Sequence, residues 1–201
     1  MSIYFTGDTH FGHANIIRYC KRPFSSADEM DETIIANLNA VVQPRDTLYH
    51  LGDFCFGRFD IVSRAQAYLD RIKCKNIILV IGNHDPHYED GTPRREFAYL
   101  FSGCYNILRK KMTDEQLGLD RHLIVMCHYA MRVWDKSHFG SYNLFGHSHN
   151  TLADDPRLLS MDVGVDANNF KPINLAQIKA VMDTRTFVPI ISNREREGIG
   201  A

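Results

Sequence analysis

The sequence lacks the cysteine patterns that are typical of disulfide-rich proteins and zinc ribbons. It has five cysteines in 201 residues, irregularly spaced and with no Cys-x-x-Cys pair. An odd, scattered set of this kind indicates free thiols in a reducing compartment. We therefore expect a cytoplasmic protein.

Net charge and long apolar stretches are also missing. The formal net charge is −1, and neither a signal peptide nor a membrane-spanning run is visible. Weak overall charge gives no sign of a broad nucleic-acid-binding or membrane-binding surface, but it does not exclude a local basic cleft. We expect no membrane partner, and the oligomeric state stays open.

No repeat, low-complexity tract or linker divides the chain. A hydrophobic content of 44% suits one compact domain with a substantial core. We predict a single domain over residues 1–192, followed by a polar, glycine-containing tail over residues 193–201.

Histidine, in contrast, is abundant, with ten residues, and most of them fall in or beside five short polar strings. These strings are Asp8-Thr9-His10, Gly52-Asp53, Gly82-Asn83-His84-Asp85, the single His128, and Gly146-His147-Ser148-His149. Alone, an Asp and a His after a strand are often a helix cap and a surface residue, and Gly-Asp is a common turn. Together they offer carboxylate, amide and imidazole ligands for two divalent metals, with one acidic residue left to bridge them.

Nearly every string follows a short apolar run rich in β-branched and aromatic residues. The runs cover residues 3–6, 47–51, 76–81, 123–127 and 142–145. Runs of this length are typical of buried strands. Open α/β sheets bind ligands beyond the carboxyl ends of their strands, so we expect the strings to converge there.

Helical patterns separate the first strands and predict parallel pairing in that half. We predict helices from a capping box at Ser26 to Val41, over residues 61–72, from Thr92-Pro93 to before Gly103, and from Asn174 to Asp183. The second half predicts a hairpin of residues 105–112 and 123–127, a strand over 158–163 and a last strand over Thr186–Ile191.

The order Asp-x-His, Gly-Asp, Gly-Asn-His-Asp, lone His and Gly-His-x-His resembles the calcineurin-like metallophosphoesterase superfamily. The similarity runs from Asp8 to His149 without a substitution in the motifs. Phe11-Gly12-His13 and Cys20-x-Arg22-Pro23-Phe24 further resemble a subfamily of small bacterial and phage phosphoesterases. The resemblance implies an α/β (mixed α+β) fold, a four-layer α-β-β-α sandwich of two mixed sheets.

The resemblance also implies the role of each motif residue. One metal would be held by Asp8, His10 and His149, the other by Asn83, His128 and His147, with Asp53 bridging both. This ligand set suits Mn, Fe, Zn or Ni without choosing among them. A hydroxide between the metals would be the nucleophile, and His84 would protonate the leaving oxygen with its tautomer fixed by Asp85.

Residues outside the ligand set have two interpretations each. His13 contacts a bound phosphate or caps the helix that follows it, and Arg22 binds phosphate or forms a surface ion pair. His50 is structural or supports the ligands. Trp134, among Arg132, Lys136 and His138, stacks on a base or anchors its loop.

We therefore expect a dinuclear metal-dependent hydrolase acting on a small phosphodiester or phosphomonoester. A nuclease acting on short or single-stranded nucleic acid is the alternative, although the weak charge disfavours a processive one. A non-catalytic scaffold should have lost ligands, and all are present. A protein phosphatase is disfavoured because the chain has little room for a groove-building extension.

Overall fold

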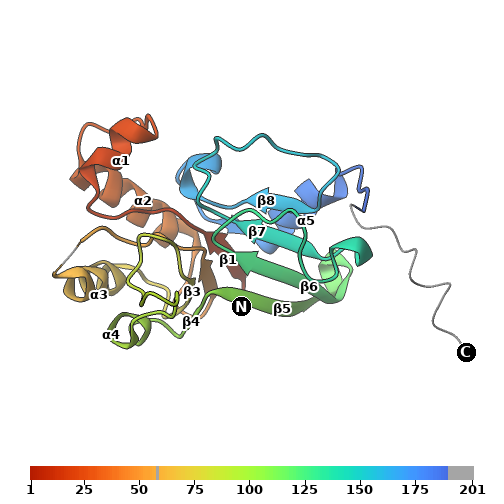
Figure 1. The fold of residues 1–201 in the computed structure, drawn as a ribbon, viewed down its shortest axis with the longest axis horizontal. Coiled ribbons are helices and arrows are strands. Elements are labelled where there is room, and N and C mark those ends of the chain that lie inside the picture. Colours follow the sequence, from red (N-terminus) through yellow and green to blue (C-terminus); the bar gives the residue numbers. More distant parts are fainter. Residues whose placement is uncertain (58, 190–201) are drawn as a thin grey trace, which may run out of the picture.

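The computed structural model describes residues 1–57 and 59–189. Figure 1 shows two sheets packed together and flanked by helices. The helices are α1 Ala14–Tyr19, α2 Ala27–Val41, α3 Ile61–Arg71, α4 Arg95–Ala98 and α5 Leu175–Asp183. The strands are β1 Ile3–Thr6, β2 Thr47–His50, β3 Asn76–Val80, β4 Gly103–Tyr105, β5 Ile107–Asp114, β6 Leu119–Cys127, β7 Tyr142–Phe145, β8 Ser160–Asp162 and β9 Ile173–Asn174. Two mixed sheets flanked by helices confirm the predicted fold class.

The first sheet has the order β4-β3-β2-β1-β9. Its first four strands are parallel, as the strand-helix alternation predicted, and β9 joins β1 in the antiparallel direction. Thr6 pairs with His50, and His50 pairs with Leu79, so β1, β2 and β3 end level with one another. The polar strings that follow these strands consequently start from one edge.

The second sheet has the order β5-β6-β7-β8. The hairpin of β5 and β6 confirms the antiparallel pair predicted from the sequence, with both strands extended further toward the turn. Strands β6, β7 and β8 are parallel, so His128 and the Gly146–His149 string also leave from carboxyl ends. The loops that carry the polar strings of both sheets thus meet in the same region.

Each face of the first sheet buries a different set of side chains. Leu48 and Leu79 pack with α2 and α3, while Phe5, Tyr49 and Val80 pack against the second sheet. Alternate residues of a strand point to opposite faces, so doubly buried strands are apolar throughout. The helix α5 buries residues in the same cluster as the second sheet. Within the described residues, none of the helices combines the length and the hydropathy that crossing a bilayer requires.

Some element predictions need correction. α4 begins at Arg95 instead of Thr92, because Thr92 and Pro93 form a small turn that brings Pro93 opposite His87. β8 covers only residues 160–162. Residues 186–189 form no strand. They donate two backbone hydrogen bonds to Pro156 and Arg157, and proline has no N–H to continue a ladder. Ile190, Ile191 and the predicted tail 193–201 lie outside the described residues.

Candidate active site

The structure brings together all seven residues that the sequence predicted as ligands, and most of them stand on strained backbone. Asp8, His10, Asp53, His147 and His149 have positive φ values between 45° and 64°. Such φ values are uncommon outside glycine, cost on the order of 1–3 kcal/mol each, and cluster at functional sites. The sharp turns after β1, β2 and β7 let consecutive residues face the same space.

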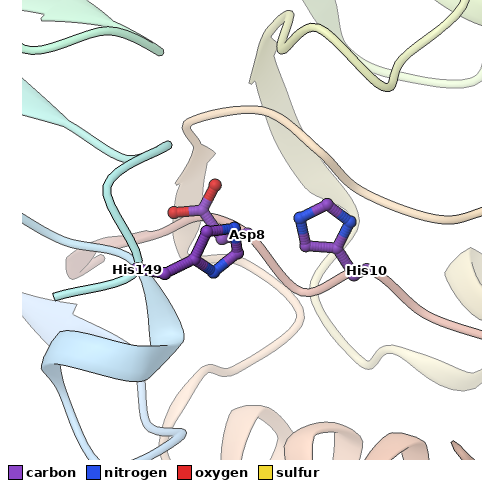
Figure 2. A group of neighbouring side chains, drawn as sticks. All are labelled: Asp8, His10 and His149. Carbon is purple, nitrogen blue, oxygen red and sulfur yellow. The ribbon is translucent and has the colours of Figure 1, made fainter. Parts of the chain in front are cut away.

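A first group consists of Asp8, His10 and His149, whose ligand atoms all lie within 4.8 Å of one another. Figure 2 shows His149 meeting Asp8 from a loop of the second sheet, with His10 on the chain that continues from Asp8. Both carboxylate oxygens of Asp8 accept from the backbone N–H of His147 at 2.9 Å. This bond fixes the loop of the second sheet to the end of β1.

A second group consists of Asp53, His128 and His147, again with ligand atoms within 4.8 Å. Asn83 belongs beside it, because its Oδ1 lies 3.1 Å from Nε2 of His128. Nδ1 of His147 lies 3.2 Å from the same nitrogen. Amide oxygen, carboxylate and imidazole nitrogens thus converge at one point.

Asp53 stands between the two groups. Its Oδ2 lies 3.4 Å from Nε2 of His10 and 3.4 Å from Nε2 of His128. Its Oδ1 accepts from the backbone N–H of His84 at 2.8 Å. One carboxylate oxygen therefore reaches a histidine of each group, which is the position a bridging ligand requires.

The residues fit a pair of cations. The ring of His10 is 1% exposed, yet neither of its nitrogens has a hydrogen-bond partner among the described residues. A buried, unpaired imidazole is costly unless a metal ion takes its lone pair. Carboxylate, amide and imidazole ligands together suit first-row transition metals.

Burial and neighbouring charges shift the pKa values of Asp8 and Asp53 in opposite directions. Burial raises the pKa of Asp8 to about 7, against the lowering effect of His128 and His149. Burial would also raise the pKa of Asp53, but the hydrogen bond and charge of His128, with His10, hold it below its usual range. Asp53 is thus ionised at neutral pH.

Glycine in the motifs lets backbone approach the carboxylates. A Cβ added to Gly82 would lie 2.2 Å from Oδ1 of Asp53, and one added to Gly146 would lie 2.7 Å from Oδ2 of Asp8. No real Cβ tolerates these distances. Sterics therefore require glycine immediately before Asn83 and before His147.

His84 lies at the opening of the site. Its side chain is exposed, and its ring centroid lies 5.2 Å from that of His10 and 6.3 Å from that of His13. It is therefore close to the first group and free to meet a ligand from solvent.

Asp85 does not orient His84, which corrects the sequence prediction. Its carboxylate is buried and accepts from three backbone N–H groups, those of Gly82, Asp53 and Phe54, at 2.8 to 2.9 Å. Among the described residues this carboxylate makes no hydrogen bond to the His84 ring, which is exposed. Asp85 instead ties the loop after β3 to the loop after β2.

His13 lies against the site without capping α1. It occupies the N-cap position, but its side chain makes no cap hydrogen bond, so the capping interpretation is wrong. Its ring stacks on Phe56, with centroids 4.0 Å apart, and lies 5.5 Å from the His10 ring. Burial lowers the pKa of His13, which keeps the ring neutral at pH 7.

Arg22 is not available to a phosphate, and this also corrects the sequence prediction. The residue is 5% exposed, and its side chain donates to both oxygens of Asp166, to the carbonyl oxygens of Asp8 and Thr9, and to the sulfur of Met30. All five guanidinium donors are thus used inside the protein. Its ion pair is buried and does not lie on the surface.

Asp166 is a site residue that sequence reasoning missed. Its Oδ2 accepts from Nδ1 of His149 at 2.7 Å, while Arg22 holds both its oxygens. Burial works to lower the pKa of His149, but the bonds to Asp166 and Cys20 raise it to about 10. Asp166 follows β8, so the rule that chemistry follows strand ends could have found it.

Two further side chains support the loops. His50 is buried and its Nε2 lies 3.0 Å from the Thr9 hydroxyl, which donates to the carbonyl of Phe54. Burial lowers the pKa of His50 to about 3, so it stays neutral and structural.

Trp134 is 6% exposed and donates from Nε1 to the Ser141 carbonyl, so it anchors its loop and is too buried to stack on a base.

The chain is similar to known proteins over most of its length. The family described as calcineurin-like phosphoesterase matches residues 1–160. The uncharacterized protein MJ1445 of Methanocaldococcus jannaschii is 30% identical over 196 residues, which are 95% of this chain and 97% of that protein.

Two solved structures are also similar. AQ665 of Aquifex aeolicus, a protein of unknown function, has a TM-score of 0.63 and 25% identity over 90% of this chain and 98% of its own. The nuclease MPE of Pseudomonas putida has 20% identity over 73% of this chain and 61% of its own, with a TM-score of 0.41 that is too low to equate the folds. Members of the matched family are metal-dependent phosphoester hydrolases that use divalent metals at a dinuclear site. Because the match covers residues 1–160, the chain belongs to the calcineurin-like phosphoesterase family.

Proposed function

We propose that this chain hydrolyses small phosphodiesters or phosphomonoesters with two divalent metals that share Asp53. The observation that supports this most is the position of Asp53 Oδ2, 3.4 Å from a histidine nitrogen of each group. Asp8, His10 and His149 would hold one ion, and Asn83, His128 and His147 the other. The ligand types fit Mn, Fe, Zn or Ni.

When bound, the two ions supply a water of lowered pKa and offset the negative charge that develops on phosphate. His84 would protonate the leaving oxygen. It is exposed, its backbone is fixed by Asp53, and its ring stands beside His10. In this proposal the proton comes from the imidazole, and the alcohol leaves neutral.

His13 would contact the substrate phosphate beside His84, whose ring centroid lies 6.3 Å away. Its Nδ1 is buried without a partner among the described residues, and stacking on Phe56 holds the ring in place. A neutral imidazole can donate one hydrogen bond to a phosphate oxygen without adding a charge.

A nuclease acting on short single strands is the second candidate. It is favoured by the exposed aromatic rings of Tyr19 and Phe56, which flank His13 and could stack on bases.

We also propose a cytoplasmic location, which the five free cysteine thiols suit.

The test is a panel assay of the purified protein. It compares bis(p-nitrophenyl) phosphate, p-nitrophenyl phosphate, cyclic nucleotides and single-stranded oligonucleotides, each with Mn, Ni, Zn and Mg. We expect metal-dependent turnover of at least one small ester. If only oligonucleotides are cleaved, the second candidate replaces the first.

The variant Asp53→Ala tests the bridging role in the same assay. We expect the loss of the second metal and of turnover, because the repulsion of two cations would no longer be offset. Loss of a catalytic group typically costs far more than tenfold, so retention of more than about a tenth of the activity contradicts the proposal. Asp120→Ala, at an exposed acid on β6, is the matched control.

A further inference from the structure

A cavity of about 310 Å³ adjoins Asn83 and His128 of the second group. Asn83 and His128 form its inner wall, and Cys127, Tyr129, Asn106 and Ile107 are among the remaining lining residues. His10, His13 and His84 do not line it. Its volume lies near the lower limit of ligand pockets, which hold roughly 300–1,000 Å³.

The cavity has no carboxylate, ammonium or guanidinium group, and its titratable lining residues are His87, Cys127, His128 and Tyr129. A second phosphate or a carboxylate would find no cation there beyond the metal group itself, and burying an unpaired charge is costly. Apart from the two histidines, the walls offer no charged partner, which favours a neutral group over an anionic one.

Two side chains give the cavity an apolar and aromatic character. Ile107 leaves 51% of its surface exposed at the start of β5, and Tyr129 leaves 48% exposed. The Tyr129 ring contacts the rings of His128 and His147 edge-on, with centroids 5.1 Å and 4.6 Å apart. These contacts orient the ring beside the second group, where it can pack against a flat ligand.

Asn106 supplies the polar contact. Its side chain is exposed, and within the described part of the chain it forms no hydrogen bond. The amide has two donor hydrogens and an acceptor oxygen, so it can pair with a heterocycle edge or with a sugar hydroxyl. A flat ring beside Tyr129 and a polar edge beside Asn106 together describe a nucleoside.

We propose that this cavity binds the retained ester group of a phosphodiester, and that this group is a neutral nucleoside. The inference rests on the proposed function. Water oxygen forms a bond to phosphorus, the bond from phosphorus to the other alcohol breaks, and that alcohol leaves with a proton from His84. The water gives up one proton, which restores the protonated His84, and keeps the other on the oxygen now bonded to phosphorus. The products are a nucleoside monophosphate and the alcohol.

The kinetic test compares thymidine 5′-(p-nitrophenyl phosphate) with methyl p-nitrophenyl phosphate, which share a leaving group. We expect kcat/KM to be at least tenfold higher for the thymidine ester. Ile107→Trp, which fills the cavity, should remove that preference by raising KM while the methyl ester changes less than twofold. Val41→Trp, at an exposed residue that ends α2, is the control and should leave both unchanged.

A second test measures binding to the cavity without turnover. Thymidine added to the metal-free protein should perturb the NMR signals of Ile107 and Tyr129, with affinity at least tenfold weaker in Ile107→Trp and weaker in Asn106→Ala. Hydrolysis of the methyl ester without any thymidine preference, or equal effects of Ile107→Trp on both esters, overturns the pocket assignment alone. Failure to hydrolyse either diester, and p-nitrophenyl phosphate as well, with any metal overturns the proposed function instead.

Discussion

Single residues at this site are held in place by hydrogen bonds from other parts of the protein. The backbone N–H of His147 binds Asp8, that of His84 binds Asp53, and Asp166 binds His149. Ligands fixed in this way lose little freedom when a metal binds, which raises affinity. The strained φ values of five ligand residues indicate that the fold tolerates a cost for this placement.

His84→Ala separates acid catalysis from metal binding. We expect both metals to remain, while hydrolysis of alkyl esters slows by roughly 10²–10⁴-fold, the usual contribution of a positioned acid. With p-nitrophenyl esters the loss should be smaller, because that group departs with little protonation. Rates for both ester types are measured alongside metal content. Loss of a metal, or an equal slowing of both esters, rules out the assigned role.

Asp166→Ala tests the support behind His149. Removing a carboxylate that orients a ligating histidine typically costs 10–100-fold in metal affinity. It also leaves Arg22 as an unpaired buried charge, a change worth about 3–5 kcal/mol in the free energy of unfolding. Metal titration and urea unfolding of the metal-free variant measure the two effects.

The control for this variant is Asp155→Ala, which breaks an exposed ion pair with Arg157. Exposed pairs contribute about 0–1 kcal/mol, so stability and metal affinity should hardly change. If Asp166→Ala behaves like this control, Asp166 is not a support of the metal site.

At the scale of elements, the caps and the hydrophobic periodicity predicted the helices that pack on the sheets. In α2 the Ser26 side chain accepts from the backbone N–H of Glu29, as a capping box requires, but the Glu29 carboxylate turns to Ser25. The Asn174 box of α5 forms completely. Sequence spacing thus identifies a cap, while the choice between adjacent partners depends on local geometry.

Ser26→Ala should lower the free energy of unfolding by about 1 kcal/mol, because the first turn of α2 loses a bonded N–H. Urea denaturation measured by circular dichroism gives the value. Ser25→Ala is the matched control, since its hydroxyl reaches only the exposed Glu29 side chain. Equal effects in the two variants would show that the cap of Ser26 adds nothing.

For the whole molecule, the sequence predicted the sheet edge at which the ligands meet, because each ligand string follows a buried strand. The sequence could not predict how buried polar groups pair across that edge. Asp85 follows His84 directly but points to the loop after β2, and Arg22 meets Asp166 across 144 positions of sequence. Pairing of this kind depends on tertiary packing, which periodicity and spacing do not encode.

The count and position of bound metals give the most direct test of a dinuclear site bridged by Asp53. After reconstitution with excess Mn, elemental analysis and anomalous scattering from crystals should give two ions per chain. We expect one ion among Asp8, His10 and His149, the other among Asn83, His128 and His147, and Asp53 in contact with both. A single ion, no ion, or two ions that do not share Asp53 would contradict a dinuclear site bridged by Asp53.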